Sequence, residues 1–347
     1  MYPYIIFLLT IIILSLFEKK IGKKKYLIIS FLLMFVFITI KDYHYFHDHD
    51  YYVEVFNYAK RGNLFKLFEN YSAEPGYLLL TYIVRYYTND YYIFLSICAF
   101  ISLIGPYIFI KNNSKNYKIS ILIYLFLSFF SLNYILRGSI ALSIYLIGLD
   151  KLRKKKVLNY IFFVILASCF HKTIIITTLV LIPYIYNQLK RNKYNKCIYI
   201  IYILIIALLF MFKKQIVEFL MGTLYRNYVG VEFKGGGYKL LLVICLISII
   251  ITFIKEKYIN EKNEILIDCF NLSIPFQILS TDFGPINRIT IYFMMPLIII
   301  VPELIELIKE KNRKNVELGI CSLLCILLIF KMITGSAFCE YHIFFIK

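Results

Sequence analysis

Long apolar runs alternate with short polar segments along the whole chain. A helix needs about 17–25 apolar residues to cross a bilayer, and tyrosine-rich ends can extend shorter runs into the interface. The pattern therefore predicts an all-α, polytopic transmembrane helix bundle with roughly eleven to thirteen crossings. The first run is expected to be a retained helix rather than a cleaved signal peptide. The runs are 2–17, 27–40, 91–110, 119–135, 157–170, 173–186, 197–212, 240–254, 265–280, 289–305 and 316–333.

Lysines in the polar segments predict the orientation of the bundle. Six short segments hold 24 of the 39 lysine and arginine residues. Cytoplasmic loops concentrate these residues, so we assign all six to the cytoplasm. The segments are 18–26, 111–118, 151–156, 190–196, 255–262 and 309–314.

The opposite face then carries outer loops near 41–76, 213–239 and 281–288, with shorter turns between them. The apolar segment "GYLLLTYIVRYY" begins at residue 76 and lies between two positions that must both be outside. At about a dozen residues, it is short for a crossing and favours a re-entrant or interfacial segment near 76–88. The alternative is that 52–68 also crosses, which adds two passes.

Composition supports a single integral membrane domain over residues 1–347. The chain is 60% hydrophobic with a mean hydropathy of +0.71, whereas soluble domains are roughly 45–50% apolar. No polar stretch is long enough for a soluble catalytic domain. The eight cysteines are scattered and show neither metal-ligand spacing nor a disulfide framework. The net charge of +18 follows the topology and gives no reason to expect nucleic acid as a partner.

The arginines do not follow the lysines. Five of the eight fall at outer positions, which the positive-inside rule leaves unexplained. A guanidinium binds phosphate and carboxylate in a bidentate manner, so a shared anionic ligand is one interpretation. The alternative is that these side chains reach the interface or pair with nearby carboxylates. The five are Arg61, Arg85, Arg137, Arg226 and Arg288.

Two of these arginines are expected at helix starts. Arg137 opens the run "RGSIALSIYLIGL", and Arg288 follows the turn "DFGPIN". Helix N-termini favour anions through free N–H groups and the helix dipole. Arg137 is therefore predicted to belong to an outward-facing anion site.

Two short motifs carry candidate acidic groups. "HDHD" at 47–50 permits a metal site, a hydrogen-bonding surface loop, or a role for Asp50 in orienting a sugar hydroxyl or accepting its proton. "EPGY" at 74–77 places Glu74 at a helix cap, ahead of a proline suited to the first helical position. Glu74 is alternatively a base or a sugar ligand.

A lone histidine and several tyrosines complete the candidates. His171 lies at an outer turn between two apolar runs, where proton transfer or phosphate binding competes with a structural role. The loop 225–239 combines aromatic residues with a triple glycine and is expected to be flexible, with rings able to stack on sugars. Tyr51, Tyr77 and Tyr225 are the candidate substrate-binding residues.

Five segments together resemble the EpsG family, which comprises Wzy-type bacterial polysaccharide polymerases. The resemblance runs from about residue 40 to 300. The chain departs from the family's usual pattern at Asp48–His49 and at Gly138. The segments are "HDHDYYVEVF", "EPGYLLL", "LRGSIALSIYLIGL", "FHKTIIITTLVLIPY" and "INRITIYFMMPL".

The resemblance implies that oligosaccharide repeat units on undecaprenyl pyrophosphate are joined on the outer face of the bacterial cytoplasmic membrane. Besides the lipid-linked oligosaccharide and membrane lipids, it implies a chain-length regulator and a flippase as partners. No cofactor and no metal are expected. Alternative functions are a flippase for the same lipid-linked sugars and a membrane O-acyltransferase acting on the polysaccharide.

The resemblance also assigns roles to the candidate residues. The pyrophosphate would be bound by arginines, because negative charge grows on it as it leaves. Three groups compete to accept the proton of the attacking sugar hydroxyl. The pyrophosphate-binding residues are Arg137, Arg288 and Arg226, and the catalytic candidates are His171, Asp50 and Glu74.

Overall fold

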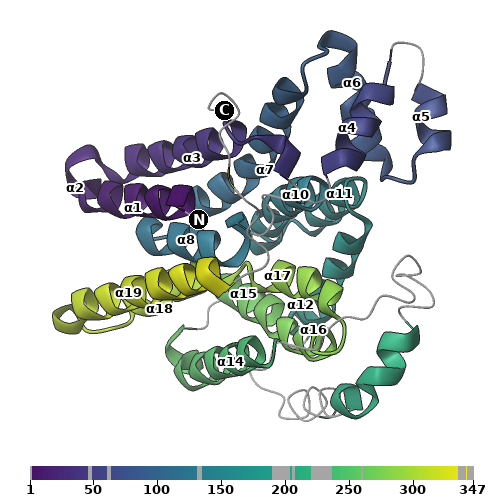
Figure 1. Ribbon diagram of the computed structural model, residues 1–347. Coiled ribbons are helices and arrows are strands. Elements are labelled where there is room, and N and C mark those ends of the chain that lie inside the picture. Colours follow the sequence, from purple (N-terminus) through teal and green to yellow (C-terminus); the bar gives the residue numbers. More distant parts are fainter. Residues whose placement is uncertain are drawn as a thin grey trace. The chain divides into compact units, whose positions relative to one another are not determined.

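The protein is described by a computed structural model that covers residues 2–45, 49–60, 64–130, 135–189, 204, 208–219, 237–258, 261–334 and 341. Every element named along these residues is a helix, which confirms the predicted all-α class. The α-helices are α1 (Tyr2–Leu16), α2 (Glu18–Ile21), α3 (Lys23–Thr39), α4 (His49–Tyr58), α5 (Leu64–Asn70), α6 (Pro75–Tyr87), α7 (Tyr91–Asn113), α8 (Tyr117–Tyr124), α10 (Leu136–Arg153), α11 (Val157–Ser168), α12 (Leu181–Leu189), α14 (Tyr238–Tyr258), α15 (Glu261–Asn271), α16 (Ser273–Ser280), α17 (Asn287–Met294), α18 (Leu297–Glu306) and α19 (Glu310–Thr334) (Figure 1). Shorter 3₁₀ or π segments are η1 (Tyr43–Tyr45), η2 (Leu125–Phe129), η3 (Lys172–Val180) and η5 (Gly284–Ile286).

The chain groups into two compact units. Unit 1 comprises Met1–Ile175 with Val301–Lys347, and unit 2 comprises Ile176–Ile300. The candidate groups Glu74, Arg137 and His171 all belong to unit 1. The prediction of a single membrane domain stays a prediction.

Individual helix lengths bear on the predicted crossings. Among the described residues, two helices, α7 and α19, are long and apolar enough to cross a membrane. Residues 284–294 and 297–306 form a third span if the pair, bent by 44°, is counted as one. Four shorter apolar helices include α1 and α11. These features agree with a membrane helix bundle, while the number of eleven to thirteen crossings stays a prediction.

The centre of unit 1 is a close crossing of α7 and α10, and α11 packs on the other side of α10. At Gly105 of α7, an added Cβ would overlap the backbone oxygen of Ser143. The Ser143 hydroxyl accepts a hydrogen bond from the Gly105 N–H at 2.9 Å and donates one to the Ile101 carbonyl at 2.5 Å. Small residues permit such close helix contacts where lipid provides no hydrophobic driving force.

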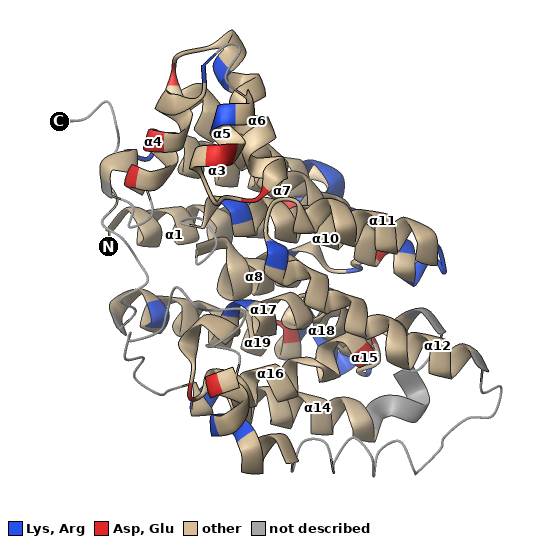
Figure 2. Cartoon of the chain, turned by 90° about the vertical axis from the view of Figure 1, so that its right-hand side faces the viewer, with Lys and Arg blue, Asp and Glu red and all other residues tan. Residues whose placement is uncertain are grey.

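Three of the lysine-rich segments lie together at one end of unit 1. Lys118 pairs with Glu18 at 3.1 Å, which joins the segments 18–26 and 111–118. The buried Asp150 accepts a hydrogen bond from Asn113 at 2.8 Å, which adds the end of α10. Figure 2 marks the charged residues on the cartoon. Three segments predicted to share the cytoplasmic face therefore lie at one end of the α7–α10 pair.

A buried ion pair lies at this same end. Arg153 donates to Glu303 of α18 at 2.8 Å and to the Asn113 side chain at 2.9 Å. Both charged side chains are 9% exposed. A buried guanidinium needs such partners, because desolvation of an isolated charge costs several kcal/mol.

The opposite end of unit 1 carries α4, α5 and α6, with α6 packed against both α4 and α5 (Figure 1). α4 has ten residues and α5 has seven, so no continuous helix spans 52–68. α6 has 13 residues and a length of about 20 Å, against roughly 30 Å of bilayer hydrocarbon. These lengths fit the re-entrant or interfacial interpretation of 76–88 and disfavour the two extra crossings.

Candidate active site

The side chain of Glu74 joins three segments that are far apart in the sequence. Glu74 is the N-cap residue of α6, followed by Pro75 in the first turn, as the motif predicts. Its side chain makes no capping hydrogen bond. One carboxylate oxygen accepts from Arg137 of α10, and the other accepts from the Lys172 N–H at 3.2 Å. The predicted cap position is therefore correct, but the carboxylate binds other segments of the chain.

The backbone holds α6 against the turn that contains His171. The Gly76 N–H donates to the Cys169 carbonyl at 2.7 Å. A Cβ built on Gly76 would lie 2.7 Å from the same oxygen, closer than real Cβ contacts allow. Glycine in "EPGY" therefore permits the approach that places Glu74 beside His171, with 3.4 Å between Glu74 Oε1 and His171 Nδ1.

Arg137 occupies the predicted place at a helix start, as the second residue of α10. Its Nη1 lies 2.5 Å from Glu74 Oε2. The guanidinium carbon lies 5.8–6.0 Å from the ring centres of three tyrosines, within the range of cation–π attraction. The rings are those of Tyr51, Tyr52 and Tyr77.

Glu74 and Tyr52 form hydrogen bonds with the Arg137 side chain, but one of its N–H groups is left over. Nε is buried and has no hydrogen-bond partner among the residues that the structure describes. The side chain as a whole is 26% exposed, so the site remains open to a ligand. A buried N–H without a partner is uncommon in native proteins, and Arg85 and Arg313 have an Nε in the same state. A phosphate or carboxylate oxygen would form a charge-assisted hydrogen bond with this Nε–H.

The surroundings of Glu74 keep it ionised. Burial opposes the charge, but contacts from His171 and the positive charge of Arg137 outweigh burial and lower the Glu74 pKa from 4.5 to about 2. A carboxylate with so low a pKa is a weak proton acceptor at neutral pH. Its geometry suits a different task, which is to hold the arginine and the histidine in place.

His171 is the better placed proton acceptor of the two. It lies just before η3, with its side chain 13% exposed. Its ring also approaches α10, since a Cβ on Gly138 would lie 3.9 Å from His171 Cδ2. His171 therefore lies near the start of α10, and Glu74 contacts both His171 and Arg137.

Together, these motifs define a pattern that can be compared with known protein families. The sequence model of the EpsG family matches residues 24–344, nearly the whole chain. The chain belongs to the EpsG family. This family is associated with polysaccharide polymerisation. No curated protein and no solved structure matches the chain significantly.

The remaining candidates of this EpsG family member lie in different environments. Asp50 is exposed in the first turn of α4, and among the described residues no hydrogen bond or ion pair joins it to Arg137 or Glu74. Arg288 is the second residue of α17 in unit 2, after η5, as the sequence predicts. Tyr225 and Arg226 lie outside the described residues.

The predicted first-loop motif is only partly described. His47 and Asp48 lie outside the described residues, while the buried His49 stacks on Tyr43 with ring centres 4.3 Å apart. No group of three metal-binding side chains occurs in the described part of the chain.

Two residues of this EpsG site were not predicted from the sequence. Tyr52 lies beside Arg137, but 32 tyrosines in the chain hide any single one. Gly76 belongs to the motif "EPGY", but only its contact with Cys169 shows why a side chain is excluded at this position. A glycine directly after a helix-starting proline was the available signal.

Proposed function

We propose that this EpsG family member polymerises oligosaccharide repeat units carried on undecaprenyl pyrophosphate, as a metal-independent glycosyltransferase. The observation that carries the proposal is Arg137, a largely buried guanidinium with one edge held by Glu74 and with Nε unpaired. A pyrophosphate oxygen is a fitting acceptor for the Nε–H of Arg137, and charge-assisted hydrogen bonds of this kind are strong. Of the three tyrosine rings around Arg137, those of Tyr52 and Tyr77 are buried, so the partly exposed ring of Tyr51 is the one proposed to stack on a sugar.

In the reaction, a hydroxyl of the acceptor sugar attacks the anomeric carbon of the donor. A new C–O bond forms as the bond to the pyrophosphate breaks, and the lipid pyrophosphate leaves with the bonding electrons. Arg137 stabilises the negative charge that grows on the leaving group. The hydroxyl proton passes to His171, which Glu74 positions. The exposed Asp50 is proposed to orient the acceptor.

We also propose an orientation of the protein in the membrane and its partners in the cell. The site is proposed to face outward from the bacterial cytoplasmic membrane, with the lysine-rich end of unit 1 in the cytoplasm. A flippase would deliver the lipid-linked unit to the outer leaflet, and a chain-length regulator would act on the product. Arg288 and Arg226 are proposed to bind further phosphate oxygens, and Tyr225 to contact sugar.

The decisive experiment compares Arg137→Lys with the matched control Arg313→Lys in proteoliposomes that contain the host cell's own lipid-linked repeat unit. Arg313 pairs with Glu306 at 3.0 Å and lies far from the site in sequence. Products are separated by chain length, and the leaflet that holds the units is determined. We expect the control to make the full ladder and Arg137→Lys to leave single units on the outer leaflet.

Two results would contradict the proposal. A normal ladder from Arg137→Lys would mean that the arginine only stabilises the fold. Repeat units that stay on the inner leaflet would indicate a flippase instead of a polymerase.

A further inference from the structure

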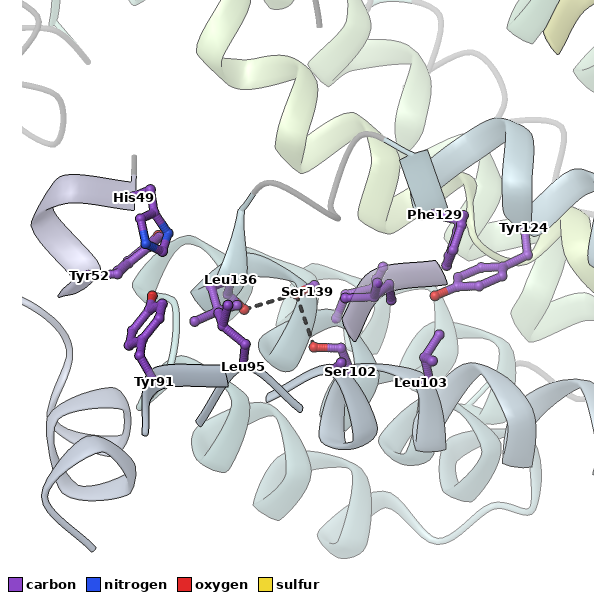
Figure 3. Close-up of a pocket in the computed structure, with 13 residues that line it drawn as sticks. His49, Tyr52, Tyr91, Leu95, Ser102, Leu103, Tyr124, Phe129, Leu136 and Ser139 are labelled. Carbon is purple, nitrogen blue, oxygen red and sulfur yellow. Dashed lines mark hydrogen bonds between the residues drawn. The ribbon is translucent and has the colours of Figure 1, made fainter. Parts of the chain in front are cut away.

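A surface cavity lies at the C-terminal end of α6, in the part of unit 1 that carries α4 and α5 (Figure 1). Its volume of about 340 Å³ is within the range of ligand-binding pockets. Another cavity, around α7 and α10, holds only about 50 Å³ between mainly apolar walls, which is room for a few water molecules (Figure 3). The larger cavity is the one with room for an organic ligand. It is lined by Lys60, Arg85, Tyr86, Tyr87, Thr88 and Asn89.

Two cationic side chains line this cavity, and no described carboxylate pairs with either. Lys60 follows the end of α4 and is exposed, and it forms no hydrogen bond or ion pair with any other residue that the structure describes. Arg85 donates to the Thr88 carbonyl at a long 3.4 Å. The next acidic residue along the chain, Asp90, already accepts the Tyr92 N–H at 2.8 Å as the N-cap of α7. The cavity therefore presents positive charge to a ligand.

Packing holds the guanidinium of Arg85 in place. Its central carbon lies 5.2 Å from the ring centre of the buried Phe56 on α4, within the range of cation–π attraction. Positive side chains at helix C-termini also complement the helix dipole, which accounts for a cation after α4 and another at the end of α6. The dipole does not account for their convergence, from two helices, on one open cavity.

An exposed apolar stripe leads along α6 to the same cavity. Its members follow the spacing i, i+4, i+7 and i+8, which places them on one helix face. Other residues of α6 are buried, and the helix packs against α4, α5 and α7. The stripe is about 12 Å long, and its last two residues line the cavity. It consists of Leu79, Ile83, Tyr86 and Tyr87, which are 43%, 46%, 42% and 82% exposed.

This combination suits an anionic amphiphile better than a soluble anion. A phosphate would lie between Lys60 and Arg85, and a hydrocarbon chain would cover Leu79 and Ile83. A soluble acidic sugar would gain nothing from the apolar stripe. The length of α6 fits an interfacial or re-entrant segment, and tyrosines concentrate at the level of the lipid headgroups.

We propose that the cavity binds the phosphate headgroup of an anionic membrane phospholipid, with one acyl chain along the apolar stripe. The site is distinct from the arginine site, because Arg85 lies eleven positions along α6 from Glu74, about 16 Å along the helix axis. It also does not depend on the proposed polymerase activity. The bound lipid holds the C-terminal end of α6 at the interface, while the other end of this helix carries Glu74.

The test uses phosphatidylglycerol with a photoreactive diazirine on its acyl chain. The full-length protein is reconstituted in phosphatidylcholine nanodiscs that contain a small fraction of this probe, illuminated and digested. We expect label on residues 79–87. Unlabelled phosphatidylglycerol should displace the probe, whereas additional phosphatidylcholine should not. This measurement needs no variant, so it does not depend on the folding of a mutant.

Variants then test the two cations. Lys60→Gln and Arg85→Gln should each weaken binding of phosphatidylglycerol about fivefold, since each cation near an anionic lipid contributes a similar share. The control is Lys66→Gln, which removes the same charge from an exposed position on α5 outside the cavity lining and should bind normally. Lys60 has no described partner to lose, so its substitution tests the site without disturbing the packing.

Several results would overturn the proposal. Equal displacement by phosphatidylcholine would show that the headgroup charge is irrelevant, and equal displacement by soluble glycerol phosphate would show that the acyl chain is irrelevant. Displacement by farnesyl pyrophosphate at much lower concentration would assign the cavity to a polyprenyl lipid. Losses in Lys60→Gln and Arg85→Gln no larger than in Lys66→Gln would remove the cations from the site. If these tests succeed while Arg137→Lys keeps a normal polymer ladder, the polymerase proposal fails and the phospholipid site stands.

Discussion

Replacing Glu74 with glutamine removes the charge opposite Arg137 and leaves an amide oxygen that can still accept the Lys172 N–H. The ion pair is tight, with 2.5 Å between Arg137 Nη1 and Glu74 Oε2, and the Glu74 side chain is 11% exposed. The variant would therefore leave a largely buried guanidinium without its counter-charge. We expect a clear loss of stability and a changed pH dependence.

The magnitude follows from the Glu74 pKa, which falls from 4.5 to about 2 in the folded protein. That difference corresponds to about 3 kcal/mol of stabilisation. Solvent reaches the partly exposed arginine and screens the pair, which reduces the expected value to about 2 kcal/mol. Because the folded pKa is the lower one, the stabilisation is complete above pH 4.5 and is lost as the pH falls towards 2.

Equilibrium unfolding by sodium dodecyl sulfate in mixed micelles, followed by far-ultraviolet circular dichroism, measures the effect. Glu74→Gln should be about 2 kcal/mol less stable than the natural protein at neutral pH, and the two should converge near pH 2. The exposed Glu54→Gln is the control and should change stability by less than about 0.5 kcal/mol. A double-mutant cycle with Arg137→Gln should return most of the loss as coupling. Coupling below about 0.5 kcal/mol, with no pH dependence, would refute the reasoning.

Three further substitutions test the packing around the site and at the opposite end of unit 1. Gly76→Ala should destabilise the fold by about 1–3 kcal/mol and reduce polymer yield, because its methyl group meets a backbone carbonyl; normal values would contradict the close approach. Gly105→Ala should lower the unfolding free energy by a similar amount, about 1–3 kcal/mol, through contact with Ser143, and an unchanged midpoint would show that the helices can separate. Arg153→Met should cost about 3–5 kcal/mol by leaving Glu303 unpaired, and adding Glu303→Met should restore part of it; additive losses would rule out the pair.

Local signals in the sequence were sufficient for several features. Pro75 marks the start of α6, and the break before Arg137 marks the start of α10. Glu74 and Arg137 could therefore be placed at helix N-termini. The resemblance to the EpsG family was confirmed over residues 24–344. These features depend on neighbouring residues or on quoted motifs, which a single sequence contains.

Long-range contacts could not be predicted in the same way. The sequence predicted Glu74 as a helix cap, or alternatively as a base or sugar ligand, yet its carboxylate binds Arg137, 63 positions away. The number of crossings was equally hard to infer, because apolar runs do not reveal where an α-helix gives way to a π or 3₁₀ segment. The run 119–135 contains the π segment η2, and the run 173–186 begins with η3 before α12.

The hydroxyl of Ser143 lies at one of α7's own backbone hydrogen bonds, since the Ile101 carbonyl is the regular helical acceptor of the Gly105 N–H. An α7 that enters the bilayer alone can therefore satisfy both groups by itself, with no unpaired donor exposed to lipid. Once α10 arrives, its serine joins the same two groups, and the contact locks the axial position of one helix against the other. Biogenesis of the α7–α10 pair can thus proceed in two steps, insertion followed by docking, without breaking backbone hydrogen bonding at either. In a complete mutational scan, position 143 should tolerate alanine, whereas position 105 should accept glycine alone.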